Sequence, residues 1–276
     1  MLRFFRLVVL GGIVVINWVL IAMFLSLFKD SPNFAGIGAI VVEGGLVAVA
    51  LSPWGERYFR FTNRLRRPLP QEGDVLYPAL ERLAARCGLN RMPEVFIQHN
   101  AHPNALAVGT GTVAVTTGLL QQAPAEEIEA VLAHEVGHLV NGDTKIRLVA
   151  YVTNAAGNVA LWALTGIILV MSVVGFGGGM MGGDRSMSGF GWFMLLLAWS
   201  LKASIWILTK LLQLSYLAVG RREEYAADEY AARHGYRDGL IAFLSRPGDV
   251  KPERVMAALH ATHPAPEARI ERLMRL

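Results

Sequence analysis

The stretch "VLAHEVGHLVNGD", Val131 to Asp143, decides how we interpret the rest of the chain. It carries His134 and His138, four residues apart, and Glu135 directly follows the first histidine. Residues four apart lie on one face of a helix, so both imidazoles can bind a single metal ion. Glu135 then lies about 100° further round the helix, where it reaches a water molecule at the metal without being a ligand. The stretch therefore predicts a metal site on a helix.

A hydrolytic zinc site needs a third protein ligand, and we find a candidate downstream in "RREEYAADEYAARHG". Glu224 and Asp228 are four residues apart there, so they face the same way on a predicted helix. Glu224 would be the third ligand, and Asp228 would accept a hydrogen bond from a ligand imidazole. The spacing alone fits a solvated acidic face equally well. We interpret the neighbouring Glu223 and Glu229 as surface residues.

Long apolar segments indicate a membrane protein. Of the 276 residues, 53% are hydrophobic, whereas a soluble chain has about 45–50%. Four runs are long enough to cross a hydrocarbon core of ~30 Å as helices. They are Leu7–Phe28, Ala35–Pro53, about Leu148–Val174 and about Phe190–Leu208. A cleaved signal peptide is the alternative for the first run, but its apolar part is too long and no small-residue cleavage site follows.

The second and fourth runs each contain a charge, Glu43 and Lys202. An unpaired charge inside a membrane is costly, so we expect the two to neutralise each other. The third and fourth runs are joined by "GFGGGMMGGDRSMSG", residues 175–189, which we expect to be a loop because glycine-rich sequence has little tendency to fold.

Basic residues near the ends of the runs predict the orientation in the membrane. Only Lys29 and Arg185 lie in the two short loops, whereas the other sides of the runs are rich in Arg and Lys. Both termini and the long middle segment should therefore be cytoplasmic. The single cysteine, Cys87, agrees with a reducing compartment. The sequence thus predicts a multi-pass protein of the cell (inner) membrane.

The remaining sequence predicts a small α+β domain made of two segments, 56–145 and 211–276. The transmembrane hairpins are then 7–53 and 148–208. Helical spacing marks "DVLYPALERLAARCGL", "PAEEIEAVLAHEVGHLVNG" and "EEYAADEYAARHGY", whereas "EVFIQH" and "TVAVTTGLL" have the β-branched character of strands. We expect turns at "NAHPN" and at Gly109–Gly111. The basic residues lie beside apolar runs and are not interleaved with aromatics, so no nucleic-acid partner is expected.

These motifs together resemble the HtpX family of membrane zinc metalloproteases, relatives of the CAAX prenyl proteases. The resemblance is carried by "HEVGHLVNGD", by the four spans and by "GRREEYAADEYA" after the last span. "HPNALAVG", residues 102–109, is similar to the family's Asn-Ala segment, and "THPAPEARIERL", residues 262–273, to its C-terminal His-Pro segment. Gly220 stands where the family has serine, which affects no ligand.

The resemblance implies a cytoplasmic, mainly helical, zincin-type metalloprotease domain with a small β-sheet and one Zn²⁺ per chain. It implies zinc ligands at His134, His138 and Glu224, a general base at Glu135 and a supporting carboxylate at Asp228. It also implies that Asn104 and His263 contact the substrate carbonyl or stabilise the oxyanion. From the residue pattern alone, Asn104 is a turn residue and His263 a surface histidine.

The resemblance also implies the substrate class, namely misfolded or damaged membrane proteins cleaved in stress response and quality control. A strand such as Val113–Thr117 would bind the substrate in extended form by edge pairing. Two alternatives stay open. A CAAX-type prenyl protease would need a large lipid-lined chamber, for which four spans are few. A transporter with a chance His-Glu-x-x-His motif would have Glu43 and Lys202 as its functional centre.

Overall fold

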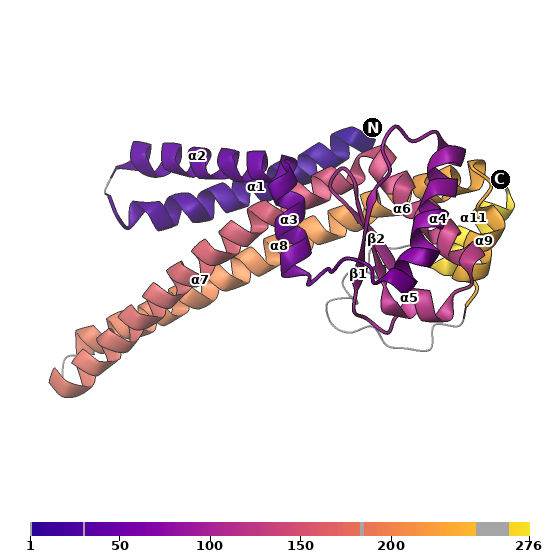
Figure 1. The fold of residues 1–276 in the computed structure, drawn as a ribbon. Helices are drawn as coiled ribbons and strands as arrows, with labels where there is room; N and C mark the ends of the chain where they lie inside the picture. The colour runs from indigo at the N-terminus through magenta and orange to yellow at the C-terminus, as the bar shows by residue number, and fades with distance from the viewer. Residues whose placement is uncertain (1, 30, 183–184, 247–264) are drawn as a thin grey trace. The chain divides into compact units, whose positions relative to one another are not determined.

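The computed structural model describes residues 2–29, 31–182, 185–246 and 265–276, which are mostly helical (Figure 1). The chain divides into two compact units. One comprises residues 1–2, 49–149 and 217–276, and we call it the sheet unit. The other comprises residues 3–48 and 150–216, and we call it the hairpin unit.

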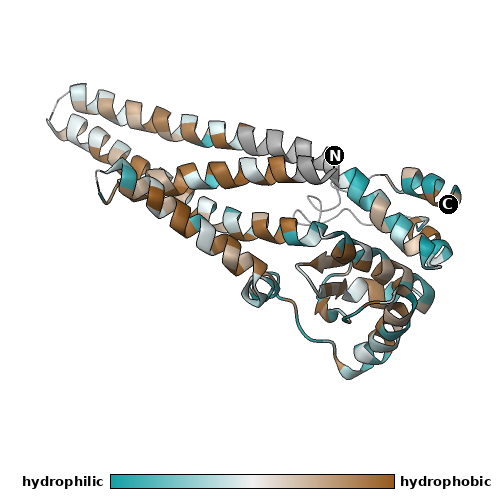
Figure 2. Ribbon diagram, turned by 90° about the horizontal axis from the view of Figure 1, so that it is seen from above, coloured by the Kyte–Doolittle hydropathy of each residue, from teal (hydrophilic) through white to brown (hydrophobic). Residues whose placement is uncertain are grey.

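Four helices in the described part of the chain are long and apolar enough to cross a membrane, as the sequence predicts. They are α1 (Leu2–Ser26), α2 (Pro32–Leu51), α7 (Asp143–Gly182) and α8 (Arg185–Arg233). Figure 2 shows how strongly hydrophobic residues dominate them. The first two form a hairpin in which the Trp18 indole N–H donates to the Gly36 carbonyl, 3.2 Å away.

The hairpin of α7 and α8 is closed by glycines, and the predicted loop across residues 175–189 is wrong. Helix α7 continues to Gly182 and α8 begins at Arg185. A Cβ on Gly175 would lie 2.7 Å from the Gly191 backbone nitrogen, so the two backbones meet at a distance that only glycine permits. Glycine disfavours a helix in water, but between apolar helices it allows this close packing.

The expected ion pair between Glu43 and Lys202 is also wrong. The Lys202 side chain is exposed on α8, where its ammonium lies 5.3 Å from the centroid of the Trp162 ring. Glu43 is only 4% exposed, and neither of its carboxylate oxygens has a hydrogen-bond partner among the described residues. Similar depth along two helices was therefore not enough, because the two side chains do not face each other. In the same unit the Asn17 side-chain amide donates a hydrogen bond to Asn154 Oδ1 at 3.2 Å.

The sheet unit is built on three strands in the order β1-β3-β2. Strand β1 (Glu94–Gln98) runs parallel to the fully buried β3 (Thr112–Thr116), and β2 (Ala105–Val108) runs antiparallel to it. The sequence predicts β1 and β3 but misses β2. Because β3 is the central strand, the expected edge pairing of a substrate with Val113–Thr117 is wrong.

Helices pack around this sheet. The strand predicted for "TVAVTTGLL" is correct only for its first half, because the chain continues as a helix from Thr117. Thr116 caps α5 (Thr117–Gln122) by accepting a hydrogen bond from the Leu119 N–H. The other helices of the unit are α3 (Pro53–Thr62), α4 (Pro70–Cys87), α6 (Ala125–Asn141), α9 (Arg237–Leu244) and α11 (Pro266–Met274).

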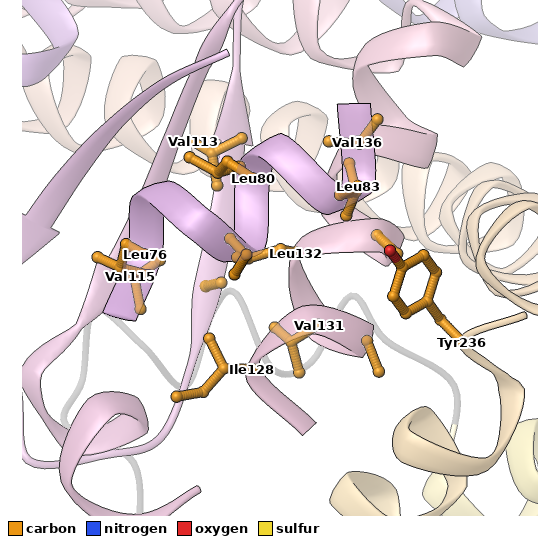
Figure 3. Packing of buried hydrophobic residues seen from close by; sticks show 14 of the residues in the cluster. Leu76, Leu80, Leu83, Val113, Val115, Ile128, Val131, Leu132, Val136 and Tyr236 are labelled. Carbon is orange, nitrogen blue, oxygen red and sulfur yellow. The ribbon is translucent and has the colours of Figure 1, made fainter. Parts of the chain in front are cut away.

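The hydrophobic core of the sheet unit lies between the sheet and the apolar faces of α4 and α6 (Figure 3). The residues labelled there are Leu76, Leu80, Leu83, Val113, Val115, Ile128, Val131, Leu132, Val136 and Tyr236. One face of α6 is thus fixed in the core, and this fixes the direction in which the histidines of the same helix point.

Candidate metal centre

Helix α6 carries the His-Glu-x-x-His motif and has clear ends. Glu126 and Glu127 lie in its first turn, where negative side chains interact favourably with the positive end of the helix dipole. The helix ends at Asn141, because Gly142 adopts a left-handed conformation with a φ of 76°. His134, Glu135 and His138 are all buried. The two histidines lie on the side of the helix opposite Leu132 and Val136, since successive residues are about 100° apart.

The last turns of α8 pack against α6 at very short range. Glu224, Ala227, Asp228 and Ala231 recur at helical spacing and are all buried, so they form the packed face of α8. A Cβ on Gly137 would lie 3.0 Å from the Ala227 Cα. The glycine between the two histidines therefore allows the helices to approach closely enough for both acidic side chains to reach the imidazoles.

His134, His138 and Glu224 come together as the sequence predicts. Each offers one ligand atom, and these atoms lie within 4.8 Å of one another. His134 Nε2 is 3.4 Å from Glu224 Oε2, and His138 Nε2 is 3.3 Å from Glu224 Oε1. Donors about 2.0 Å from a tetrahedral ion lie about 3.3 Å apart, and each imidazole lies near this distance from one of the two Glu224 oxygens.

The chemistry of these donors also fits a divalent metal ion. His138 Nε2 is buried, yet it makes no hydrogen bond within the described part of the chain. Buried polar atoms are seldom left in this state unless they have another function, such as binding a ligand. Two imidazole nitrogens and one carboxylate are typical ligands of zinc and of other first-row metals.

Each histidine is oriented by a carboxylate on its other nitrogen. His134 Nδ1 lies 2.9 Å from Asp228 Oδ1, and His138 Nδ1 lies 3.2 Å from Asp143 Oδ2. Such contacts fix the tautomer and leave Nε2 for the metal. Asp228 is where the sequence predicts it. The sequence analysis assigned no function to Asp143, although its position just past the C-terminus of α6, five residues after His138, indicates that it can reach this imidazole.

Arg269 on α11 is a further buried residue of the site. Its Nε donates to Asp228 Oδ2 at 2.9 Å and its Nη2 to Asp228 Oδ1 at 2.6 Å. Its Nη1 also lies 3.7 Å from Glu224 Oε2. The sequence predicts no function for this arginine beyond its place in the family-like segment at residues 262–273. The sequence does carry one indication that Arg269 is buried, namely its four-residue spacing from Leu273. These two residues form the buried face of an otherwise polar helix.

The electrostatics of the site favour positive charge. Burial and the neighbouring Arg269 lower the pKa of His134, but hydrogen bonds to Asp228 and Glu224 outweigh them and raise it to about 9. Burial likewise acts to lower the pKa of His138, but the nearby carboxylates of Asp143 and Glu224 outweigh burial and raise that pKa. Burial acts to raise the pKa of Asp228, but its bonds to His134 and Arg269 lower it. The carboxylates thus stabilise a cation at this position.

The three residues predicted to take part in catalysis are Glu135, Asn104 and His263. Glu135 is 7% exposed and directly follows His134 on α6. Asn104 immediately precedes β2, and its side-chain oxygen accepts a hydrogen bond from the Ala105 N–H at 2.9 Å. His263 lies outside the described residues.

The interpretation of Glu223 as a surface residue is wrong. Glu223 is only 2% exposed and accepts a hydrogen bond from the Arg147 guanidinium at 2.7 Å. It is buried because α8 packs against the beginning of α7, where Arg147 lies. Glu229 is partly exposed and pairs with Arg233 one turn further along α8.

Comparisons with known proteins indicate the family of this chain. The sequence profile of Peptidase family M48 matches residues 70–276. The "Protease HtpX homolog" of Acaryochloris marina is 31% identical over 269 residues, covering 87% of this chain and 86% of the relative. "Protease HtpX" of Acinetobacter baumannii is 30% identical over 261 residues, covering 84% of this chain and 82% of the relative.

A solved structure shares the fold. The crystal structure of S. mikatae Ste24p superposes with a TM-score of 0.54 at 20% sequence identity. The match covers 92% of this chain but only 62% of the Ste24p chain, so this chain spans less than two thirds of that protein. At this identity the likeness concerns the fold alone.

A buried cluster of two histidines and one glutamate, on helices joined to apolar membrane spans, is typical of a membrane metalloprotease. This chain belongs to Peptidase family M48 and is a metalloprotease of the HtpX type. The predicted family is therefore confirmed, and the transporter alternative is wrong. The CAAX-type alternative is not favoured, because the relatives that match this chain over most of their length carry the name Protease HtpX.

Proposed function

We propose that this protein is a zinc-dependent endopeptidase that cleaves misfolded or damaged membrane proteins. The observation that carries the proposal is the placement of His134, His138 and Glu224, whose ligand atoms lie within 4.8 Å of one another. In this proposal the three side chains hold the ion, while Asp228 and Asp143 orient the two imidazoles.

A zinc ion held there supplies Lewis acidity, which polarises a peptide carbonyl and lowers the pKa of a water molecule toward ~7. Glu135 is the general base in this proposal. It takes a proton from the attacking water and delivers that proton to the leaving amine. Burial of its carboxylate keeps bulk water away from the proton that is transferred. Asn104 and His263 are proposed to donate hydrogen bonds to the oxyanion.

We place the extended substrate along β2 instead of β3. Among the described residues, β2 pairs only with β3, so its other edge is available for main-chain hydrogen bonds. Strand β2 also packs against α6, which carries Glu135, and directly follows Asn104. A peptide paired with this edge would run past the motif on α6.

The proposed location is the cytoplasmic side of the inner membrane. In this arrangement the segments 56–145 and 211–276 form the protease domain, and 7–53 and 148–208 form the membrane hairpins. We expect a cysteine at Ser186 to react with an impermeant thiol reagent added outside intact cells, and a cysteine at Arg64 not to react. The opposite labelling pattern would reverse the topology.

The proposed activity is tested on the purified full-length protein. We expect about one zinc per chain by elemental analysis, and cleavage of casein that a chelator abolishes and added zinc restores. A protein that cleaves casein equally well after its metal is removed would contradict the mechanism. A protein that binds zinc but cleaves no protein substrate would contradict the proposed activity.

A further inference from the structure

Helix α3 has a row of exposed aromatic side chains. The helix begins at Pro53, and Ser52 caps it by accepting a hydrogen bond from the Trp54 N–H at 3.2 Å. At about 100° per residue, Trp54, Tyr58 and Phe61 fall within an arc of about 60°. They are 65%, 40% and 83% exposed. We call these three residues the aromatic face of α3.

The opposite side of α3 is fixed to the sheet unit. Glu56 Oε1 accepts a hydrogen bond from the Thr110 N–H at 2.7 Å, and Glu56 Oε2 accepts one from the Thr112 hydroxyl at 2.5 Å. The Arg60 guanidinium donates to the same threonine at 3.2 Å and lies 4.6 Å from the centroid of the Phe96 ring. The helix is therefore held in one rotation about its axis, and the aromatic face points away from the unit.

The charges beside the aromatic face are positive. The exposed Arg57 guanidinium lies 5.0 Å from the centroid of the Trp54 ring. Arg64 follows the helix end and is also exposed. The only acidic side chain of α3 is Glu56, which is occupied by Thr110 and Thr112 on the other side of the helix. Exposed aromatics next to arginines match the boundary between acyl chains and anionic headgroups.

The position of α3 in the chain indicates which partner covers this face. The apolar span of α2 ends at Leu51, and α3 begins at Pro53. Two residues reach at most about 7 Å, so α3 must begin within that distance of the end of a membrane span. Tryptophan and tyrosine are enriched at this depth of membrane proteins. A lipid surface is therefore favoured over a second protein.

We propose that the aromatic face of α3 lies in the headgroup layer of the membrane and that Arg57 and Arg64 bind anionic lipid there. Because Glu56 binds the turn between β2 and β3, this contact also holds that turn close to the membrane surface. The inference concerns lipid binding and does not depend on the proposed peptidase activity.

Site-specific quenching in nanodiscs tests the proposal. In full-length protein carrying Cys87→Ser, an environment-sensitive fluorophore is attached to Phe61→Cys, and in a matched control to Glu81→Cys on the exposed side of α4. Lipids spin-labelled near the headgroup should reduce the fluorescence at position 61 at least about twofold and leave position 81 nearly unchanged. Equal quenching at both positions would overturn the proposal. So would a shielded probe at position 61 that lipid does not quench, since that face would then be covered by protein.

The charge contribution is tested with the same probe. Quenching at position 61 should be stronger in nanodiscs that contain phosphatidylglycerol than in purely zwitterionic ones. Replacing Arg57 and Arg64 together by glutamine should remove this difference. If quenching is the same with and without anionic lipid in the parent protein, the anionic-lipid part of the proposal is wrong.

Discussion

Replacing Arg269 by methionine tests how the metal centre is supported. Methionine keeps most of the apolar stem but removes the guanidinium, and with it both hydrogen bonds to Asp228, at 2.9 and 2.6 Å. Asp228 is only 2% exposed, so its charge would then rely on His134 alone. Breaking a buried charge pair by removing one partner costs about 3–5 kcal/mol, and the remaining histidine contact places our expectation at the lower end, about 3 kcal/mol.

Thermal unfolding and zinc titration measure this effect. For a chain of this size, about 3 kcal/mol corresponds to a melting temperature lower by roughly 6–12 °C. Zinc affinity should fall about 10–100-fold, because the carboxylate that orients His134 is no longer held in place. Arg269→Lys should recover only part of the loss, since a lysine cannot form both bonds in the same plane. The control is Arg275→Met, an exposed position near the end of the chain.

The pH dependence has a defined sign. Hydrogen bonds to His134 and Arg269 lower the pKa of Asp228, so this carboxylate stabilises the fold above its unfolded pKa of about 3.9 and loses that contribution as the pH falls toward its folded pKa. The difference in the free energy of unfolding between the parent protein and Arg269→Met should therefore be largest at neutral pH. It should become smaller below about pH 4. An unchanged melting temperature and zinc affinity at neutral pH would refute the reasoning.

Three further substitutions follow from the packing of the sheet unit. Asp143→Asn should weaken zinc binding about 10–100-fold, because it removes the carboxylate that orients His138. A metal-competition titration measures this change in affinity. Gly137→Ala should lower stability by about 1–3 kcal/mol through overpacking, although alanine is the better helix former, whereas Gly166→Ala, with nothing within 4 Å of its Cβ, should not. Glu223→Ala should cost about 1–2 kcal/mol in thermal melts because it removes a buried charge-assisted hydrogen bond, and Glu229→Ala should stay within about 0.5 kcal/mol.

Local patterns predicted the four apolar helices, α4, α6 and the three side chains that meet at the candidate metal centre. The spacing of His134 and His138 and the glycine that ends α6 depend on a few adjacent residues, so they can be recognised without tertiary structure. The spacing of Glu224 and Asp228 at i and i+4 fits a zinc site and a solvated acidic face equally well, and the resemblance to the HtpX family selected Glu224 as the third ligand. The four spans follow from hydropathy alone.

Long-range packing decided what the sequence could not. Glu223 looks like any surface glutamate, and only the contact with Arg147 buries it. Strand β2 is short and is stabilised by its pairing with β3, so its own residues carry a weak signal. Arg269 acts through Asp228, which is 41 residues away in the sequence. The glycines before α8 were interpreted as a loop, because propensities measured in water do not include close packing between apolar helices.

Glutamates 135 and 224 provide the most direct test of the central claim, since they are assigned different functions in one site. Glu135→Gln should keep zinc near one per chain and keep thermal stability, while casein cleavage falls by several orders of magnitude because the base is lost. Glu224→Ala should lose zinc and activity together, since only two protein ligands remain. Glu229→Ala is the control on the same helix as Glu224 and should keep both. Full activity of zinc-loaded Glu135→Gln, or full zinc occupancy in Glu224→Ala, would contradict the account.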